Sequence, residues 1–262
     1  MPEPLSIYIG WDSREPVASH VAAHSLIKRT TSQLRIRYLK HRELRKAGHF
    51  KRHWGIDAST GNFVDYVDGR PFSTEFSHTR FLVPFLNCYQ GWALFMDADM
   101  VFQCDVKDLF ALCDDKYAVM VVKHNHKPKN GIKMDGRVND QYHRKNWSSF
   151  VLFNCSHPAN RMLTKERVSF LSGAELHGFN WLTDNQIGTL PHSYNYIAGT
   201  SPVLPSERKN IPHVIHYTDG GPWFDECKDV PYALTWVEEY EDWQRNGDTK
   251  NKICEVESTR YE

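Results

Sequence analysis

The segment "WALFMDADMVF" (Trp92–Phe102) is the most informative part of the chain, because it places two acidic residues inside an apolar run. The apolar stretch Trp92–Met96 predicts a buried strand, and Asp97 and Asp99 follow at its carboxyl end. Residues two apart in an extended segment point to the same face, so both carboxylates should face one direction. A buried unpaired charge is costly, and we therefore expect a positive partner beside them.

The flanking sequence predicts a strand–helix–strand unit. Residues 5–10 alternate apolar and polar positions, the following helix has Ser13 as its expected cap and Pro16 in its first turn, and residues 34–40 alternate again. Further strands are expected at 117–122 and 149–154. Such an order favours an α/β fold with a mixed, mainly parallel sheet flanked by helices.

The length of 262 residues fits one domain, 1–262. Within it, residues 123–147 form a polar, basic stretch that we interpret as a loop able to cover a site, and a C-terminal tail begins at about residue 232. The chain carries 32 basic and 32 acidic side chains, so global charge gives no reason to expect nucleic acid as a partner.

The amino-terminal sequence "MPEPLSIYIGWDSREP" lacks the basic and apolar regions of a signal peptide. No apolar run approaches the roughly 20 residues that span a bilayer, so we expect no transmembrane segment. The six cysteines form no CxxC pair and mostly lie beside apolar residues. Buried free thiols, and hence a cytoplasmic protein, are the favoured interpretation over disulfides or a metal site.

Paired aspartates at the end of a strand favour metal chemistry. In open parallel sheets, ligands bind outside the carboxyl ends of the strands, and paired carboxylates there suit Mn²⁺ or Mg²⁺ and a phosphate-containing substrate. A haloacid-dehalogenase-like phosphatase also carries a DxD, but after its first strand. A glycoside hydrolase requires two acids on either side of a sugar cleft, farther apart than two positions on one strand place them.

A histidine that follows a late apolar strand is a candidate third ligand. In "HVIHYTDGGPWF", His216 precedes a glycine-containing turn and can complete the metal shell that Asp97 and Asp99 begin. Taken alone, a histidine at a strand end is more often a structural, hydrogen-bonded residue.

Several motifs together resemble a known family. "IYIGWDSR", "SHTRFLVPFL", "WALFMDADMVF", "SFVLFN", "TDNQ" and "VIHYTDGGPW" occur in the order of a GT-A glycosyltransferase, and most resemble the retaining family 8, which includes glycogenin and galactosyltransferases. The resemblance spans roughly residues 5–225. It implies that His216 is a metal ligand with Asp97 and Asp99.

The resemblance also implies contacts with the donor. Asp12 would contact the nucleotide base, and the pocket around the base would be lined by Ile9, Gly10 and Trp11. Arg80 would reach the donor from the helix before the metal strand, and Ala98 lies between the two metal-binding aspartates. Asn154 and Asp184 would contact the donor sugar or the acceptor, with Asn185 or Gln186 as the amide beside the reacting carbon.

One position departs from the family pattern. A lysine usually precedes the Pro-Trp pair and holds the diphosphate, but this chain has Gly221 there. The backbone N–H groups of Gly220 and Gly221 can form an anion nest. Alternatively, the positive charge comes from Lys228, Arg208 or Lys209.

These features predict a metal-dependent enzyme that transfers a sugar from a nucleotide-diphosphate donor, UDP-linked, to a hydroxyl group of a glycan or other acceptor, with retention. A nucleotidyltransferase of similar fold is an alternative, but "GWDSREP" lacks the glycine-rich phosphate loop such enzymes show. A non-catalytic module that binds nucleotide sugars is a second alternative. Donor sugar, acceptor and oligomeric state stay open.

Overall fold

The computed structural model of the chain describes residues 3–124, 144, 146–201, 212–247 and 254–257. Its centre is a seven-stranded sheet within those residues. In spatial order the strands are β10 (Ile187–Thr189), β8 (Val119–Val121), β9 (Phe150–Asn154), β6 (Trp92–Met96), β1 (Leu5–Gly10), β2 (Leu34–Leu39) and β13 (Cys254–Glu257). The expected strand–helix–strand unit is confirmed, because β1 and β2 pair in parallel.

The sheet is mainly parallel, with one reversed strand. β1 pairs in parallel with β2 and β6, and β10 with β8, whereas β9 runs antiparallel to both β6 and β8. The carboxyl end of β6 therefore lies beside the amino-terminal end of β9. The predicted mixed α/β class is confirmed.

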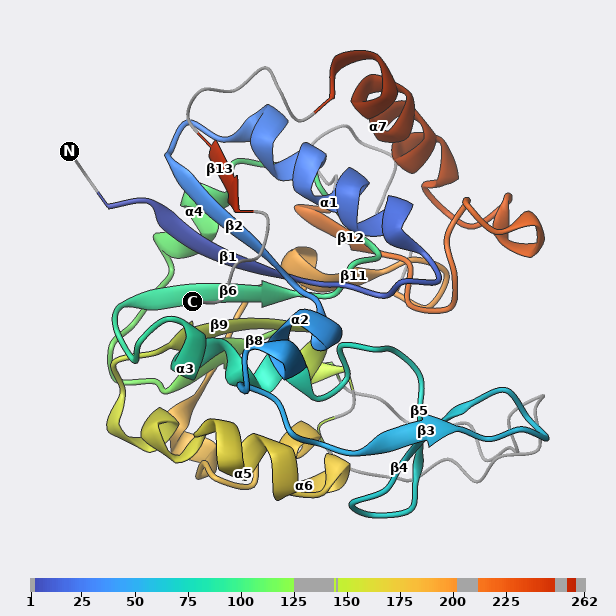
Figure 1. Cartoon of the computed structure of the whole chain (residues 1–262). Coiled ribbons are helices and arrows are strands. Elements are labelled where there is room, and N and C mark those ends of the chain that lie inside the picture. The colour runs from blue at the N-terminus through green and yellow to red at the C-terminus, as the bar shows by residue number, and fades with distance from the viewer. Residues whose placement is uncertain (1–2, 125–143, 145, 202–211, 248–253, 258–262) are drawn as a thin grey trace.

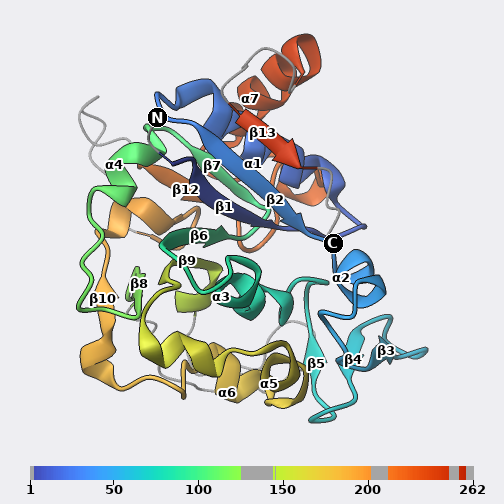
Figure 2. The same ribbon diagram turned by 60° about the vertical axis from the view of Figure 1, so that its left-hand side comes forward.

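Helices cover both faces of the sheet (Figures 1 and 2). Successive side chains of one strand point to opposite faces: Ile7 belongs to a buried cluster that contains most of the apolar face of α1, and Tyr8 to a second cluster that contains residues of α3 and α5. Burial on both faces explains why the central strands are almost continuously apolar. The α-helices are α1 (Pro16–Arg29), α2 (His41–Lys46), α3 (Val83–Leu86), α4 (Val106–Phe110), α5 (Lys165–Phe170), α6 (Gly173–His177) and α7 (Ala233–Asn246).

Two smaller sheets position the site. β7 (Met100–Phe102) pairs antiparallel with β12 (Val214–His216), and β12 pairs in parallel with β11 (Tyr196–Ile197). The strands β3 (Trp54–Ile56), β4 (Phe63–Asp65) and β5 (Pro71–Phe72) form an antiparallel sheet that projects from the body of the molecule (Figure 1). Short 3-10 helices connect these parts: η1 (Thr79–Leu82), η2 (Trp147–Ser149), η3 (Pro158–Met162), η4 (Asp184–Gln186), η5 (His192–Asn195) and η6 (Asp225–Cys227).

Some local expectations were wrong. Ser13 does not cap α1, which begins after Glu15; the Ser13 hydroxyl instead donates to Glu75 Oε1 at 2.8 Å. The polar, irregular sequence of residues 41–75 predicts loops and a short helix; α2 is such a helix, but the projecting sheet is not predicted by it. The helical spacing of the apolar residues 82–89 predicts a helix that Pro84 kinks; Pro84 instead lies in the first turn of α3, where a missing N–H costs little.

Other expectations fall wholly or partly outside the described residues. The basic loop 123–147 is described only at residues 123–124, 144 and 146–147. The tail from about residue 232 contains α7 and β13. Among the helices of the described part, none is long and apolar enough to cross a membrane.

Candidate active site

Strand pairing brings Asp97, Asp99 and His216 together. β6 ends at Met96, and the Asp97 N–H donates to the Ser149 carbonyl at 2.9 Å. The chain then enters β7, whose Met100 pairs with His216 of β12, and the Tyr217 N–H donates to the Asp99 carbonyl at 2.9 Å. His216 Nε2 lies 3.3 Å from Asp99 Oδ1 as a result.

The donor set of this cluster fits a divalent cation. One ligand atom of each residue lies within 4.8 Å of the other two. Asp97 Oδ1, Asp99 Oδ1 and His216 Nε2 are buried, and within the described part of the chain their close polar contacts are ion pairs, of Asp99 with His216 and of Asp97 with Arg80. Two carboxylates and an imidazole suit Mn²⁺, and the carboxylates alone also suit Mg²⁺. Sequence reasoning therefore identified three residues that the fold places in one cluster.

A hydrogen-bonded chain fixes the orientation of the His216 ring. The Ser149 hydroxyl donates to the Asn146 carbonyl at 2.8 Å and so accepts from Asn195 Nδ2 at 3.0 Å. Asn195 Oδ1 then faces His216 Nδ1 at 2.8 Å, which must donate its proton. The other nitrogen, Nε2, is thereby directed at Asp99, as in metal sites where an outer partner orients the histidine. No pattern in the sequence pointed to Asn195.

Arg80 is the second positive group at the cluster. It is 5% exposed, and its Nη1 lies 2.9 Å from both Asp97 Oδ1 and the Ser148 carbonyl. Its guanidinium also lies over the ring of Phe95, 4.9 Å from the centroid. Arg80 thus holds a fixed position beside Asp97, on η1 rather than on the longer helix we expected.

The protonation of the cluster follows from burial and from charge. Burial raises the pKa of Asp97 to about 7; Arg80 opposes this shift and Asp99 adds to it. Burial alone would lower the pKa of His216, but the neighbouring Asp99 raises it above its ordinary value. Burial alone would raise the pKa of Asp99, but His216 holds it below its ordinary value. Near pH 6 the cluster therefore holds protons on Asp97 and His216.

Cation binding should depend on pH because a metal ligand must be deprotonated. Asp97 and His216 are protonated below their raised pKa values and lose the proton above them, so affinity should rise with pH. We expect at least about a tenfold gain in Mn²⁺ affinity from pH 6 to pH 7. Free Mn²⁺ measured by electron paramagnetic resonance at pH 6, 7 and 8 checks this. An affinity that stays constant over this range would contradict the assignment of these ligands.

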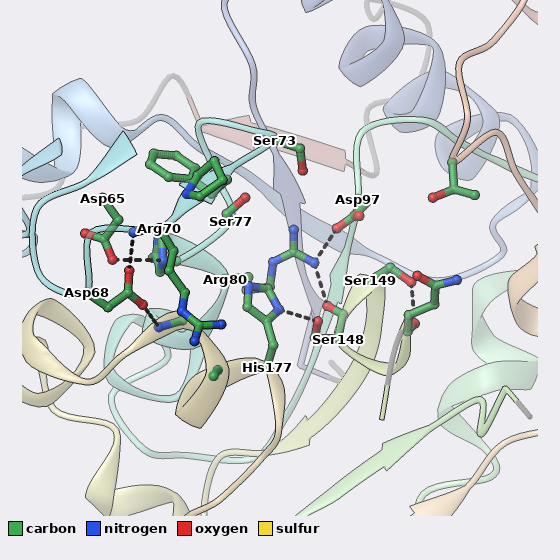
Figure 3. A pocket seen from close by; sticks show the side chains of 17 residues that line it. Asp65, Asp68, Arg70, Ser73, Ser77, Arg80, Asp97, Ser148, Ser149 and His177 are labelled. Atoms are coloured by element: carbon green, nitrogen blue, oxygen red, sulfur yellow. Dashed lines mark hydrogen bonds and ion pairs between the residues drawn. The ribbon is translucent and has the colours of Figure 1, made fainter. Parts of the chain in front are cut away.

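Two joined cavities open beside the cluster. The Asp99 cavity, about 400 Å³, is lined by Asp97, Ala98, Asp99 and residues of the turn after β12. The Asp68 cavity, about 300 Å³, is lined by residues of the projecting sheet, α6 and η2 (Figure 3). Four residues line both cavities: Ser73, Arg80, Asp97 and Thr218.

The residues predicted to surround the nucleotide base are mostly buried. Asp12 and Ile9 are 0% exposed, and a Cβ on Gly10 would lie 2.6 Å from the Phe76 ring. Within the described residues, these three do not line either cavity, so their contacts with a base stay predictions that these positions do not support. Trp11 is half-buried beneath the Lys40 ammonium, which lies 4.4 Å from its ring centroid; its contact with a base stays a prediction.

Asp12 instead positions a cation that sequence reasoning missed. Its carboxylate accepts from Arg14 Nε at 2.9 Å and Nη2 at 2.6 Å. Arg14 lines the Asp99 cavity together with Glu15, whose carboxylate accepts from Trp223 Nε1 at 3.0 Å. The short spacing in "WDSRE" was the available signal, since an Asp two residues before an Arg can hold its guanidinium.

Asn154 lies at the wrong end of its strand for the predicted contact. It pairs with Trp92 at the start of β6, and its side-chain amide donates to the Tyr117 carbonyl at 3.2 Å. The prediction that Asn154 contacts donor or acceptor is therefore wrong. Because β9 is antiparallel to β6, the residues before β9, Ser148 and Ser149, reach the Asp68 cavity in its place.

Asp184, Asn185 and Gln186 lie on the turn η4, before β10. Asp184 is paired with Arg144, and the side chains of Asn185 and Gln186 accept from Thr183. They do not line the two cavities formed by the described residues. The contact of Asp184 with the donor sugar or the acceptor, and that of Asn185 or Gln186 with the reacting carbon, stay predictions that these positions do not support.

The turn after β12 offers a partial anion site. Gly220 lines the Asp99 cavity with φ 107°, a backbone conformation that only glycine adopts without strain. Its N–H already donates to the Tyr217 carbonyl at 2.9 Å, so the nest predicted at Gly220 and Gly221 lacks one donor. Lys228 pairs with Asp225 at the surface. The other two candidate cations, Arg208 and Lys209, lie outside the described residues.

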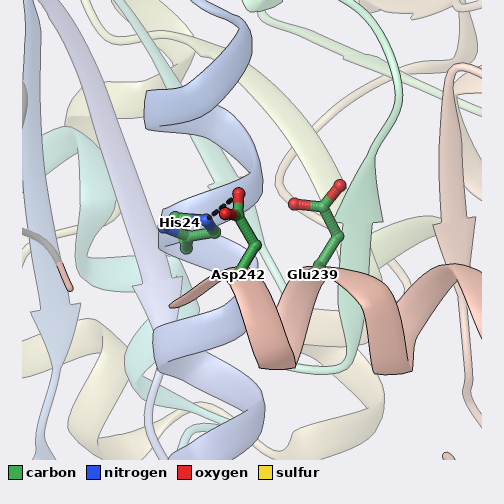
Figure 4. Close-up of side chains that lie close together, drawn as sticks. All are labelled: His24, Glu239 and Asp242. Atoms are coloured by element: carbon green, nitrogen blue, oxygen red, sulfur yellow. Dashed lines mark hydrogen bonds and ion pairs between the residues drawn. The ribbon is translucent and has the colours of Figure 1, made fainter. Parts of the chain in front are cut away.

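A second group of potential metal ligands joins α1 to α7 (Figure 4). His24 Nε2 lies 3.1 Å from Asp242 Oδ2, and Glu239 lies beside them. Here Lys28 Nζ lies 2.9 Å from Asp242, and Arg29 Nη2 is paired with Glu239. Because two cations already neutralise both carboxylates, we interpret this group as an ion-pair network that fastens α7 to α1.

Glu239→Gln should weaken this attachment. The Glu239 carboxylate is buried, and removing its charge weakens its ion pairs with Arg29 and Lys28. We expect a loss of about 1.5–3 kcal/mol in the free energy of unfolding, the range for a hydrogen bond to a charged group. Urea unfolding monitored by circular dichroism measures it. A Glu239→Gln variant as stable as wild type would contradict the interpretation. So would a stabilisation of wild type by Mn²⁺ that Glu239→Gln abolishes.

Solved structures with a similar arrangement are glycosyltransferases. LgtC, a galactosyltransferase solved with donor and acceptor sugar analogues, has a TM-score of 0.56 at 15% identity, covering 92% of this chain and 99% of its own. GlyE of Streptococcus pneumoniae TIGR4 has a TM-score of 0.57 at 11% identity, covering 93% and 64%. WbbM, a bifunctional enzyme, has a TM-score of 0.57 at 16% identity, and this chain spans about half of its length, 51%. The fold is that of the GT-A glycosyltransferases.

Sequence comparison defines the family within this class. The profile of glycosyl transferase family 8 matches residues 26–227. Protein CDI of Arabidopsis thaliana is 42% identical over 243 residues, which cover 93% of this chain and 88% of that protein. The chain belongs to glycosyl transferase family 8. It is a glycosyltransferase, which sets aside the nucleotidyltransferase and non-catalytic alternatives.

Proposed function

We propose that this glycosyltransferase moves a sugar from a nucleotide-diphosphate donor, UDP-linked, to a hydroxyl acceptor, with retention of anomeric configuration and dependence on Mn²⁺ or Mg²⁺. The observation that carries the proposal is the convergence of Asp97, Asp99 and His216 in one cluster, of which Asp97 lines both cavities and Asp99 lines one. A cation bound there would neutralise the charge that develops on the departing diphosphate.

Each side chain at the site has a separate role in this proposal. Asp97, Asp99 and His216 would hold the cation, with Asn195 fixing the ring of His216. The donor's diphosphate would occupy the Asp99 cavity, where Arg14 supplies a positive charge. Rigid, pre-positioned charges favour the transition state because they need not reorganise as the bond breaks.

Arg80 lies where the bond between sugar and phosphate would break. Arg80 lines both cavities, so its guanidinium can stabilise the negative charge that develops on the leaving oxygen as the bond to the sugar breaks. The new bond forms between the acceptor oxygen and the anomeric carbon, and the acceptor's proton passes to the leaving diphosphate. Attack on the face that the leaving group vacates gives retention, as the family resemblance implies.

We also propose a cytoplasmic location. Cys88, Cys104, Cys113, Cys155 and Cys227 are free thiols, and such thiols persist in reducing compartments.

A thermal-shift experiment tests the proposed function. Purified protein is heated with UDP or a UDP-sugar, in Mn²⁺ or in EDTA. A ligand at about 100 times its Kd should stabilise the fold by about 2.7 kcal/mol, and only with the metal. Hydrolysis of the UDP-sugar is followed in parallel. Equal stabilisation and turnover in EDTA would refute the metal scheme, and stabilisation by another nucleotide alone would refute UDP.

A further inference from the structure

The Asp68 cavity has no assigned occupant in the proposed function. It adjoins the Asp99 cavity at Asp97 and Arg80, so a group bound in it lies next to the donor's diphosphate. Part of its wall comes from the turn between β4 and β5 of the projecting sheet (Figure 3). That turn carries Asp68.

Two backbone groups fix the Asp68 carboxylate. Oδ1 accepts from the Arg70 N–H at 3.0 Å, and Oδ2 accepts from the Gly173 N–H at 2.9 Å. Each carboxylate oxygen can accept two hydrogen bonds, so each retains an acceptor position after these contacts. Asp68 is half-buried and lines the cavity, so its remaining acceptor positions are held in place before a ligand arrives.

Of the other ionisable groups of the wall, Arg70 is a cation, whereas the acids are paired and the histidines His78 and His177 are uncharged because burial lowers the pKa of each ring. Asp65 is paired with the buried Arg52, and Asp97 lies beside Arg80. His177 lines the cavity with its Nδ1 2.7 Å from the Ser148 hydroxyl. Burial, and then the nearby Arg80, lowers the pKa of His177 to about 3, so its ring is uncharged at neutral pH. Asp68 is thus a charged acceptor in a polar cavity whose other acids already have cationic partners.

A fixed acceptor in such a wall suits a hydroxyl donor. We propose that Asp68 is a specificity-determining residue that accepts a hydrogen bond from a hydroxyl of a neutral sugar ring in the Asp68 cavity. The ring belongs either to the donor or to the acceptor. This inference rests on the proposed function, since it requires the diphosphate of a nucleotide sugar in the adjoining cavity.

The experiment compares wild type with Asp68→Asn, which preserves shape and one backbone contact. Asp57→Asn is the matched control, because Asp57 also accepts from backbone N–H groups in a turn of the same sheet but lines neither cavity. Asp68→Ser is the second variant in case Asp68→Asn does not fold. In the donor arm, calorimetry with Mn²⁺ compares UDP with UDP-glucose, UDP-galactose and UDP-N-acetylglucosamine. In the acceptor arm, methyl glucoside, methyl galactoside and lactose are titrated onto protein saturated with UDP and Mn²⁺.

We expect at least one sugar probe to bind wild type and to lose about tenfold or more in affinity with Asp68→Asn, while UDP affinity and Asp57→Asn stay unchanged. Loss in the donor arm assigns the cavity to the transferred sugar, and loss in the acceptor arm assigns it to the acceptor. Equal affinities of wild type and Asp68→Asn in both arms would overturn the inference. It would also be overturned if wild type bound no UDP-sugar more tightly than UDP and bound none of the free sugars. Failure of wild type to bind UDP would instead overturn the proposed function.

Discussion

Asp99→Asn should abolish most transfer activity while leaving the fold intact. The substitution keeps size and shape but removes one of the two carboxylate charges that face His216 Nε2. A charge pair at about 4 Å contributes about 4 kcal/mol near a protein surface, so the cation should be held far more weakly. We expect kcat/KM to fall about a thousandfold, which corresponds to about 4 kcal/mol in the activation free energy.

Two measurements separate a lost metal site from a lost fold. Thermal unfolding in EDTA should give similar midpoints for Asp99→Asn and wild type, whereas added Mn²⁺ should stabilise only wild type. Asp114→Asn is the control, since Asp114 is an exposed carboxylate paired with Lys116. Turnover by Asp99→Asn within a few-fold of wild type in Mn²⁺ would disprove the role of Asp99.

Asp65→Asn should cause the largest loss of stability. Arg52 is 0% exposed, and its Nε donates to Asp65 Oδ1 at 3.1 Å while its Nη2 pairs with Oδ2. Arg52 Nη1 also donates to the Val168 carbonyl at 3.2 Å, so this pair ties the projecting sheet to α5. Removing one partner of a buried pair costs about 3–5 kcal/mol because the other charge stays buried. Guanidinium unfolding measures the loss.

A double variant shows whether the buried charge is the cause. Replacing both partners, as in Arg52→Met with Asp65→Leu, leaves no unpaired charge and should recover part of the lost stability. Asp57→Asn keeps an acceptor for the Ser59 and Thr60 N–H groups in a turn of the same sheet, so it should change stability by no more than about 0.5 kcal/mol. A double variant less stable than Asp65→Asn alone would show that the unpaired buried charge is not the main cause of the stability loss.

The central strands and the aspartate pair could be predicted because local patterns encode them. The apolar run before Asp97 defines β6, whereas His216 was assigned through the resemblance to family 8, since a histidine at a strand end is by itself more often structural. The direction of β9 could not be predicted, since an apolar run looks the same whether a strand is parallel or antiparallel. Asn154 was therefore assigned to the site in place of Ser148 and Ser149.

The roles of residues that depend on tertiary contacts could not be predicted from local sequence patterns. Asn195 is far from His216 along the chain and meets it only through β11 and β12. Asp68 lies in a polar region expected to be loop, and its role depends on α6 folding against that turn. Asp12 was expected at a ligand, but a neighbouring arginine satisfies it within the protein.

The side chains of Asp97 and Arg80, which border both cavities, have a consequence for substrate affinity. A molecule in one cavity alters the field and the freedom of groups that the other occupant also contacts. Equilibrium linkage is reciprocal, so whatever factor nucleotide binding contributes to sugar affinity, the sugar returns to the nucleotide. Titration of each substrate with and without the other should therefore give one and the same coupling factor for both, and a factor of one in both directions would show that the two cavities act independently.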